Sequence, residues 1–158
     1  MDQIHEQSNL IMSEITSRII GCAIKVHKAL GPGYDELFYQ KALTSELASA
    51  GFDVKREVEF AVYYGETLLG TKRVDLVVGE CLVELKAKRG LEDIDAAQVV
   101  SYLKASGYPL ALLINFGCTK VQTKRFVNSA GSKSVHSAPH NTPRLRDCPE
   151  EEQPTCHE

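Results

Sequence analysis

The residues best suited to chemistry lie in one stretch, residues 73–87, which reads Arg-Val-Asp-Leu-Val-Val-Gly-Glu-Cys-Leu-Val-Glu-Leu-Lys-Ala. Two runs rich in Val and Leu flank the turn-forming pair Gly79-Glu80, which predicts two antiparallel strands joined by a tight hairpin. This register sets Asp75 opposite Glu84, with Cβ atoms roughly 4.5–5.5 Å apart. Two carboxylates that close repel each other unless a positive charge lies between them, and a divalent cation meets that need.

The two faces of this hairpin differ in polarity. Side chains alternate along a strand, so Glu84 and Lys86 share one face, and the same register sets Arg73 opposite Lys86. Asp, Glu and Lys on one face of a hairpin most often form a solvated surface. Here the other face is apolar and a second apolar strand follows, which indicates a sheet covered by helices on both sides, where charged groups require a function. The predicted apolar face consists of Val74, Leu76, Val78, Val83 and Leu85.

Motifs in a fixed order give the chain a resemblance to a known superfamily over about residues 10–128. Asp75 followed by Glu84-Leu85-Lys86 resembles the Asp…Glu-x-Lys core of the PD-(D/E)xK nuclease superfamily. The other motifs are Gly33-x-x-Glu36-x-x-Tyr39, which matches the GxxExxY signature of one family in that superfamily, Gln98-x-x-x-Tyr102, which resembles a motif of RecB-like members, and a closing strand at residues 112–117.

The resemblance implies a metal site formed by Glu36, Asp75 and Glu84. Hard oxygen ligands of this kind suit Mg²⁺ or Mn²⁺. The metal would neutralise charge on a scissile phosphate and lower the pKa of a bound water. Without the resemblance, Glu36 reads as an acidic residue that complements a helix dipole.

The catalytic residues implied in this way are Asp75, Glu84, Lys86 and Gln98. Lys86 would orient the water or stabilise the transition state, and Gln98 would position either Lys86 or the water. Candidate contacts to nucleic acid are Arg73, Tyr102 and Lys88, with packing as the alternative role of Tyr102. Gln and Tyr on a helix face are otherwise common amphipathic residues.

Periodicity along the chain predicts an α/β fold. The resemblance gives it a restriction-endonuclease-like core: a mixed central sheet, made of an antiparallel meander plus a parallel strand after a crossover helix, flanked by helices. The predicted helices cover residues 8–30, 34–50 and 92–106, and the strands outside the hairpin cover residues 53–64, 108–116 and 121–128.

Length and composition fit one globular domain, residues 1–128, followed by a polar tail, residues 129–158. The 158 residues are 43% hydrophobic and 25% charged, with a net charge of −3 that argues against a broad basic surface for nucleic acid. The tail lacks periodic apolar residues and is expected to be disordered. A zinc site there is the weakest reading, because its ligands lack close pairing. They are His136, His140, Cys148, Cys156 and His157.

The sequence contains no apolar run near the roughly 20 residues that a membrane span needs. Its polar N-terminus and its five scattered cysteines predict a cytoplasmic protein with reduced thiols. The function predicted first is a metal-dependent nuclease that acts on DNA, with RNA second. The alternative is a catalytically inactive module that binds nucleic acid or protein on the same fold, which the shared register of Asp, Glu and Lys disfavours.

Overall fold

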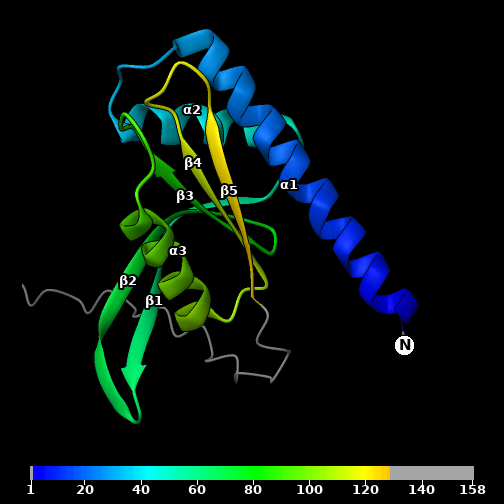
Figure 1. Ribbon diagram of the computed structural model, residues 1–158, viewed down its shortest axis with the longest axis vertical. Coiled ribbons are helices and arrows are strands. Elements are labelled where there is room, and N and C mark those ends of the chain that lie inside the picture. Colours follow the sequence, from blue (N-terminus) through cyan, green and yellow to red (C-terminus); the bar gives the residue numbers. More distant parts are fainter. Residues whose placement is uncertain (1, 129–158) are drawn as a thin grey trace, which may run out of the picture.

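The computed structural model describes residues 2–128, which form three helices and five strands (Figure 1). In chain order they are α1 (Asp2–Leu30), α2 (Glu36–Ser49), β1 (Val54–Tyr64), β2 (Thr67–Val78), β3 (Cys81–Lys86), α3 (Asp93–Ser106), β4 (Leu110–Asn115) and β5 (Gln122–Val127). The predicted tail, residues 129–158, lies outside the described residues, and so do the candidate zinc ligands in it.

The five strands form one sheet in the order β1-β2-β3-β4-β5. β3 and β4 are parallel, because α3 carries the chain over the sheet between them, and the other neighbouring strands are antiparallel. α1 and α2 cover one face of the sheet and α3 covers the other. The predicted fold class, a mixed sheet with an antiparallel meander and one parallel strand flanked by helices, is confirmed.

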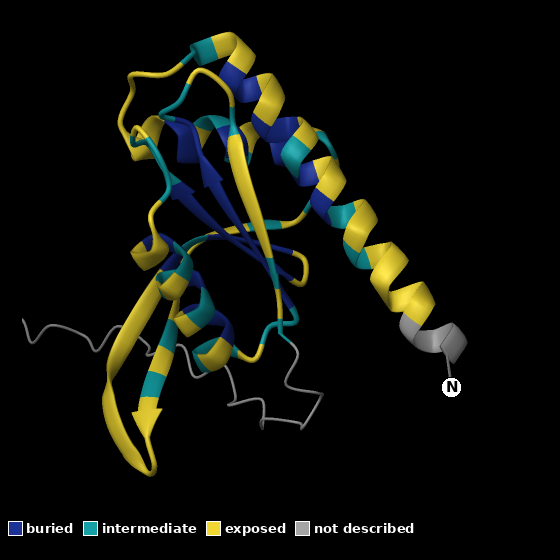
Figure 2. Ribbon diagram, viewed as in Figure 1, coloured by how far each residue is buried: buried dark blue, intermediate teal, exposed yellow. Residues whose placement is uncertain are grey.

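The central strands explain why the sequence runs of Val and Leu are unbroken. β3 and β4 contribute side chains to a hydrophobic core on each face of the sheet, and both strands are buried along their length (Figure 2). A strand buried on both faces needs apolar residues at every position. Glu84 interrupts this pattern in β3 although it is only 6% exposed, so a carboxylate is buried in the middle of the sheet.

Strands β1 and β2 change faces at the same point. Val54 packs in the core under α1 and α2, whereas Val58 packs in the core under α3. In β2, Leu76 packs in the core under α1 and α2, and Val74 packs in the core under α3. Strict alternation would keep each pair on one face. Between the members of the β1 pair, Glu57 has a φ of 52°, in the left-handed region that few residues other than glycine adopt.

The change of faces corrects one prediction and gives the molecule its shape. Val74 does not share the apolar face of Leu76 and Val78, but lies on the opposite side of the sheet. Beyond this point β1 and β2 continue as a two-stranded ribbon, residues 58–74, which extends past the sheet to a hairpin tip (Figure 1).

Two other findings concern the predicted class of protein. No helix among the described residues is long and apolar enough to cross a membrane. The three described cysteines, Cys22, Cys81 and Cys118, are free thiols, as the scattered spacing predicts.

Candidate active site

β2 and β3 separate at the two predicted carboxylates. Their pairing runs from Val78 opposite Cys81 to Leu76 opposite Val83, which confirms the predicted register, and Asp75 and Glu84 are the next positions. There the Leu85 amide donates to Oδ2 of Asp75 at 2.7 Å. In a continued ladder that amide would meet a main-chain carbonyl. The Asp75 side chain therefore replaces a backbone acceptor and is fixed by it.

Glu84 has one paired and one unpaired oxygen. Oε1 lies 3.4 Å from Nζ of Lys86, so the two side chains share a face as predicted. Oε2 is buried, and no group in the described part of the chain forms a hydrogen bond with it. Burial, with the nearby charge of Asp75 as the second cause, raises the pKa of Glu84 to about 8. An ionised Glu84 thus requires more positive charge than Lys86 supplies.

The carboxyl group of Asp75 lies in a similar environment. Burial raises its pKa, while the hydrogen bond from the Leu85 amide works in the opposite direction. The charge of Glu36 adds to the increase and that of Lys86 opposes it. Two adjacent carboxyl groups with raised pKa values form a place where a cation would bind favourably.

The backbone around Lys86 is held from the neighbouring strand. The Phe116 amide donates to the Lys86 carbonyl at 2.8 Å. The buried side chain of Asn115 accepts the Lys88 amide at 3.0 Å and donates to the Lys88 carbonyl at 2.9 Å. Gly117 passes so close that an added Cβ would lie 2.3 Å from the Lys88 backbone. The end of β4 therefore fixes where β3 presents its lysine.

α3 closes the site on one side. Its helix begins at a capping box formed by Glu92 and Asp95. Further along, the Gln98 amide donates to the Tyr102 hydroxyl at 2.6 Å. Burial raises the pKa of Tyr102, and the charge of Glu84 contributes, so this hydroxyl lies near the carboxylates. Gln98 thus contacts the site through Tyr102. The predicted catalytic role of Gln98 and the predicted role of Tyr102, in nucleic-acid contact or in packing, remain predictions.

Glu36 lies at the first position of α2, two residues later than the predicted start of this helix. Tyr39 anchors that end: its hydroxyl donates to the Gly31 carbonyl at 2.5 Å, and its ring stacks on Phe116 at 4.6 Å. Glu36 itself is exposed, and its charge acts on Asp75. The Gly-x-x-Glu-x-x-Tyr spacing therefore brings a solvent-facing carboxylate toward the site from a rigid helix end.

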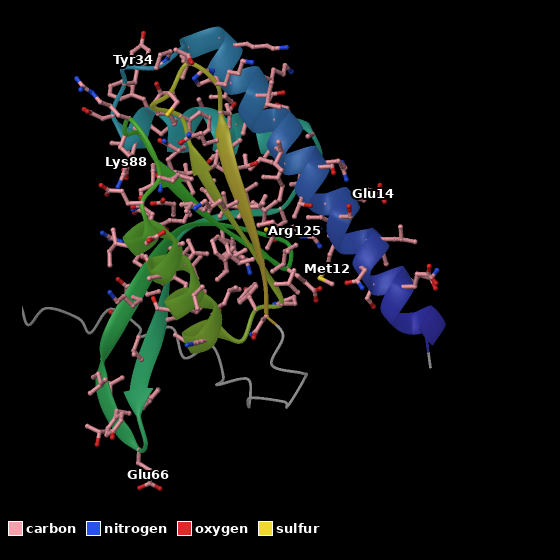
Figure 3. The ribbon with its side chains drawn as sticks, in the orientation of Figure 1. Met12, Glu14, Tyr34, Glu66, Lys88 and Arg125 are labelled. Carbon is pink, nitrogen blue, oxygen red and sulfur yellow. The ribbon has the colours of Figure 1, made fainter. Side chains whose placement is uncertain are left out.

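Two predicted contacts to nucleic acid lie in other surroundings than expected. The predicted pairing of Arg73 with Lys86 is wrong, because β2 has left β3 and Arg73 lies opposite Glu59 of β1. Arg73 thus belongs to the ribbon, whose tip carries Glu66 (Figure 3). The Nζ atom of Lys88 lies 2.6 Å from Glu92 and 2.8 Å from Asp95. The Lys88 charge is therefore paired with two carboxylates at the start of α3.

Sequence reasoning missed one residue that supports the site from α2. The buried side chain of Gln40 donates to the Asp75 carbonyl at 3.3 Å and accepts from the Arg56 guanidinium at 2.9 Å. It ties α2 to β2 where β2 leaves β3. The sequence signal that could have identified Gln40 is its position directly after Tyr39 of the GxxExxY motif, on the turn of α2 that follows Glu36.

A second missed residue is Glu57. The register of β1 on β2 is the same on both sides of it, with Arg56 opposite Leu76 and Val58 opposite Val74, so Glu57 lies opposite Asp75. Its charge adds to the increase in the pKa of Asp75. The sequence gives no signal for this, because the register of β1 on β2 shifts between Val62 and Tyr63 and so cannot be counted from the turn.

The donor set fits a hard divalent cation. Asp75 and Glu84 supply adjacent oxygens, and the unpaired Oε2 of Glu84 lacks the positive partner that a buried carboxylate requires. Among the side chains that the structure describes, those of residues 6–128, no three His, Cys, Asp or Glu groups already converge closely enough to hold a metal. Of the predicted metal ligands, Glu36 is the one with an exposed side chain, so it would have to turn inward to reach the cation.

Comparison with known proteins identifies the superfamily. A family model for the PD-(D/E)XK nuclease superfamily matches residues 13–126, which confirms the predicted superfamily. A search among curated proteins finds no match. A solved structure described as "Crystal structure of SSO0001" aligns with 13% sequence identity over 72% of this chain and 77% of that chain, at a TM-score of 0.42, and a likeness of this size carries no argument.

Proposed function

The chain belongs to the PD-(D/E)XK nuclease superfamily, and from this membership we propose that it is a Mg²⁺- or Mn²⁺-dependent phosphodiesterase of the GxxExxY group. The observation that carries the proposal is the buried, unpaired Oε2 of Glu84 beside Asp75, with Lys86 bound to the other oxygen of the same carboxylate. A buried carboxylate oxygen without a hydrogen-bond partner destabilises the fold, so a structural role alone does not account for it. A cation site accounts for it.

The proposed roles follow from the geometry of each side chain. Asp75 and Glu84 would hold the cation, and the exposed Glu36 would turn inward as the third ligand. A bound Mg²⁺ or Mn²⁺ would supply positive charge to the scissile phosphate and make a water more acidic. Lys86, 15% exposed at its side chain, would orient that water or stabilise the charge that develops on the phosphate.

The helix α3 would contribute through Gln98 and Tyr102. Their hydrogen bond aims the Tyr102 hydroxyl, which lies in the field of Glu84. We propose that Gln98 positions this hydroxyl, and that Tyr102 in turn contacts either a phosphate or Lys86. Arg73 and Lys88 are proposed as outer contacts to nucleic acid. Lys88 would have to exchange at least one of its two carboxylate partners for a phosphate.

The proposed substrate is DNA, with RNA second. The net charge of −3 makes tight binding through a broad basic surface implausible, so recognition would depend on the cation and a few lysines and arginines. Weak, salt-sensitive binding without the cation and stronger binding with it are the expected behaviour.

The test uses the full chain with labelled single- and double-stranded DNA and RNA. Each substrate is incubated with Mn²⁺, Mg²⁺ or EDTA, and the Asp75→Asn variant is the matched control. Cleavage that requires the cation and is lost in Asp75→Asn supports the proposal. Cleavage that survives in both EDTA and Asp75→Asn contradicts it, and binding without any product indicates an inactive binding module on this fold.

A further inference from the structure

We infer that Glu57 is a further carboxylate ligand of the proposed cation site, a role that rests on the function proposed above. Three acidic residues stand in a row across three neighbouring strands. Glu57 of β1 lies opposite Asp75 of β2, and Asp75 and Glu84 of β3 are the positions next to the last paired residues of the hairpin. Asp75 is therefore flanked by a carboxylate on each side.

The backbone at Glu57 is unusual, and the residue type found there does not suit it. Its φ of 52° is the one positive φ outside glycine among residues 2–128. The left-handed region costs a residue with a side chain roughly 1–2 kcal/mol. Gly, Asn or Asp would relieve much of this strain, yet the position carries Glu, whose long side chain reaches further. Strain of this kind concentrates at functional sites.

The same backbone irregularity directs the carboxylate. Strand β1 changes faces between Val54 and Val58, and β2 changes faces between Leu76 and Val74. Glu57 and Asp75 both lie at this change, where a side chain belongs to neither packed core. Glu57 is exposed, so it can turn toward a cation without breaking a buried contact.

A separate observation also indicates that a cation binds beside these carboxylates. The side chain of Glu84 is 93% buried, and its Oε2 has no partner in the described chain. Mg²⁺ takes about six oxygen ligands and is held by one or two protein carboxylates together with waters, so Asp75 and Glu84 leave coordination positions open that a carboxylate at the rim can fill directly or through a water. Glu36 approaches from α2 and Glu57 from β1, on two different elements, and the charges of both act on Asp75.

The test compares Glu57→Gln with Glu59→Gln in the full-length protein. Both variants remove one negative charge from β1, but Glu59 lies opposite Arg73 on the ribbon and not opposite Asp75. Mn²⁺ affinity is measured by isothermal titration calorimetry, and the increase in melting temperature with Mn²⁺ is measured in parallel. Glu57→Gln should weaken Mn²⁺ binding by about tenfold or more, in the range seen when groups around a metal are removed. Glu59→Gln should leave it unchanged.

Glu57→Asn separates strain from binding. Asn tolerates the left-handed region, so in EDTA this variant should melt at or above the wild-type temperature, and in Mn²⁺ it should show a smaller increase. Equal Mn²⁺ affinity of wild type, Glu57→Gln and Glu57→Asn, with Asp75→Asn defective, overturns the role of Glu57 and leaves the proposed function standing. Absence of Mn²⁺ binding by the wild type overturns both.

Discussion

Oδ2 of Asp75 accepts the Leu85 amide at 2.7 Å, one position beyond the last paired residues of β2 and β3. The Asp75 side chain thereby replaces a main-chain carbonyl as acceptor and links β2 to β3 at the point where the two strands separate. The same contact holds the carboxylate group at the point where the strands separate. The structural role of Asp75 and its proposed role as a metal ligand involve the same carboxylate, and substitutions can separate them.

Asp75→Asn should separate these roles. The amide oxygen of Asn can still accept the Leu85 amide, so the fold in EDTA should remain close to wild type in stability. Loss of the charge should reduce the increase in melting temperature that Mn²⁺ produces by binding the native state. Differential scanning fluorimetry with Mn²⁺ and EDTA measures both effects.

Asp75→Ala is the control for this prediction. It removes the acceptor and leaves a buried amide unpaired, which should cost about 1–3 kcal/mol of stability even in EDTA. If Asn and Ala destabilise the EDTA form equally, the hydrogen bond to Leu85 does not support the fold.

Glu84 should make the metal-free protein less stable as pH rises. Its pKa is raised from 4.5 to about 8 in the folded chain, so below about pH 4.5 the group is neutral in both states and imposes no cost. As pH rises toward 8 the unfolded chain ionises first, and stability falls by up to about 1.4 kcal/mol per pH unit for one proton. Asp75, whose pKa is also raised, acts in the same direction.

Urea unfolding in EDTA at intervals from pH 5 to pH 9 measures this slope. Glu84→Gln cannot ionise, so its slope should be flatter and its stability at pH 9 should exceed that of the wild type. Mn²⁺ should flatten the wild-type slope because it favours the ionised carboxylate. A wild-type protein that gains stability between pH 5 and pH 8 in EDTA contradicts the buried, unpaired state of Glu84.

The hairpin could be predicted from sequence because its register is local. Gly79-Glu80 fixes the turn, and the turn fixes every pair up to Leu76 opposite Val83. The parallel β4 follows from the helix that must cross the sheet before it. Local signals therefore suffice for the elements that carry Asp75 and Glu84.

The surroundings of these residues could not be predicted, because they depend on contacts distant in sequence. At Glu57 and Asp75 the two ribbon strands pass from the core under α1 and α2 to the core under α3, and nothing in the alternation of β1 marks this change. Lys88 forms ion pairs with Glu92 and Asp95, and these pairs depend on where α3 begins. Gln40 meets Asp75 across 35 residues of chain.

Gly117 should be essential for the end of the sheet that presents Lys86. A Cβ at residue 117 would lie 2.3 Å from the Lys88 amide nitrogen and carbonyl oxygen, and backbone cannot yield as a flexible side chain does. Gly117→Ala should therefore cost about 1–3 kcal/mol or more of stability. Urea unfolding measures this loss of stability, and the proposed cleavage activity should fall with it because Lys86 lies two residues before Lys88.

Gly21→Ala is the matched control. Gly21 lies within α1, and a Cβ there meets no atom of the described chain within 4 Å apart from its own helix. Because Gly in a helix interior costs roughly 0.5–1 kcal/mol relative to Ala, this variant should be more stable than the wild type. Equal effects at the two glycines would contradict the close approach at Gly117.

Lys86→Ala distinguishes an enzyme from a binding module. Lys86 holds Oε1 of Glu84 but is no ligand of the cation, so its removal should leave Mn²⁺ binding within a few fold of wild type. Cleavage should fall by about 100-fold or more, as when a group that stabilises developing charge is removed. In an inactive module the same substitution would only weaken association with nucleic acid. Calorimetry with Mn²⁺, single-turnover cleavage and binding in Ca²⁺ measure the three quantities on one preparation, and a variant that cleaves at the wild-type rate would exclude Lys86 from catalysis.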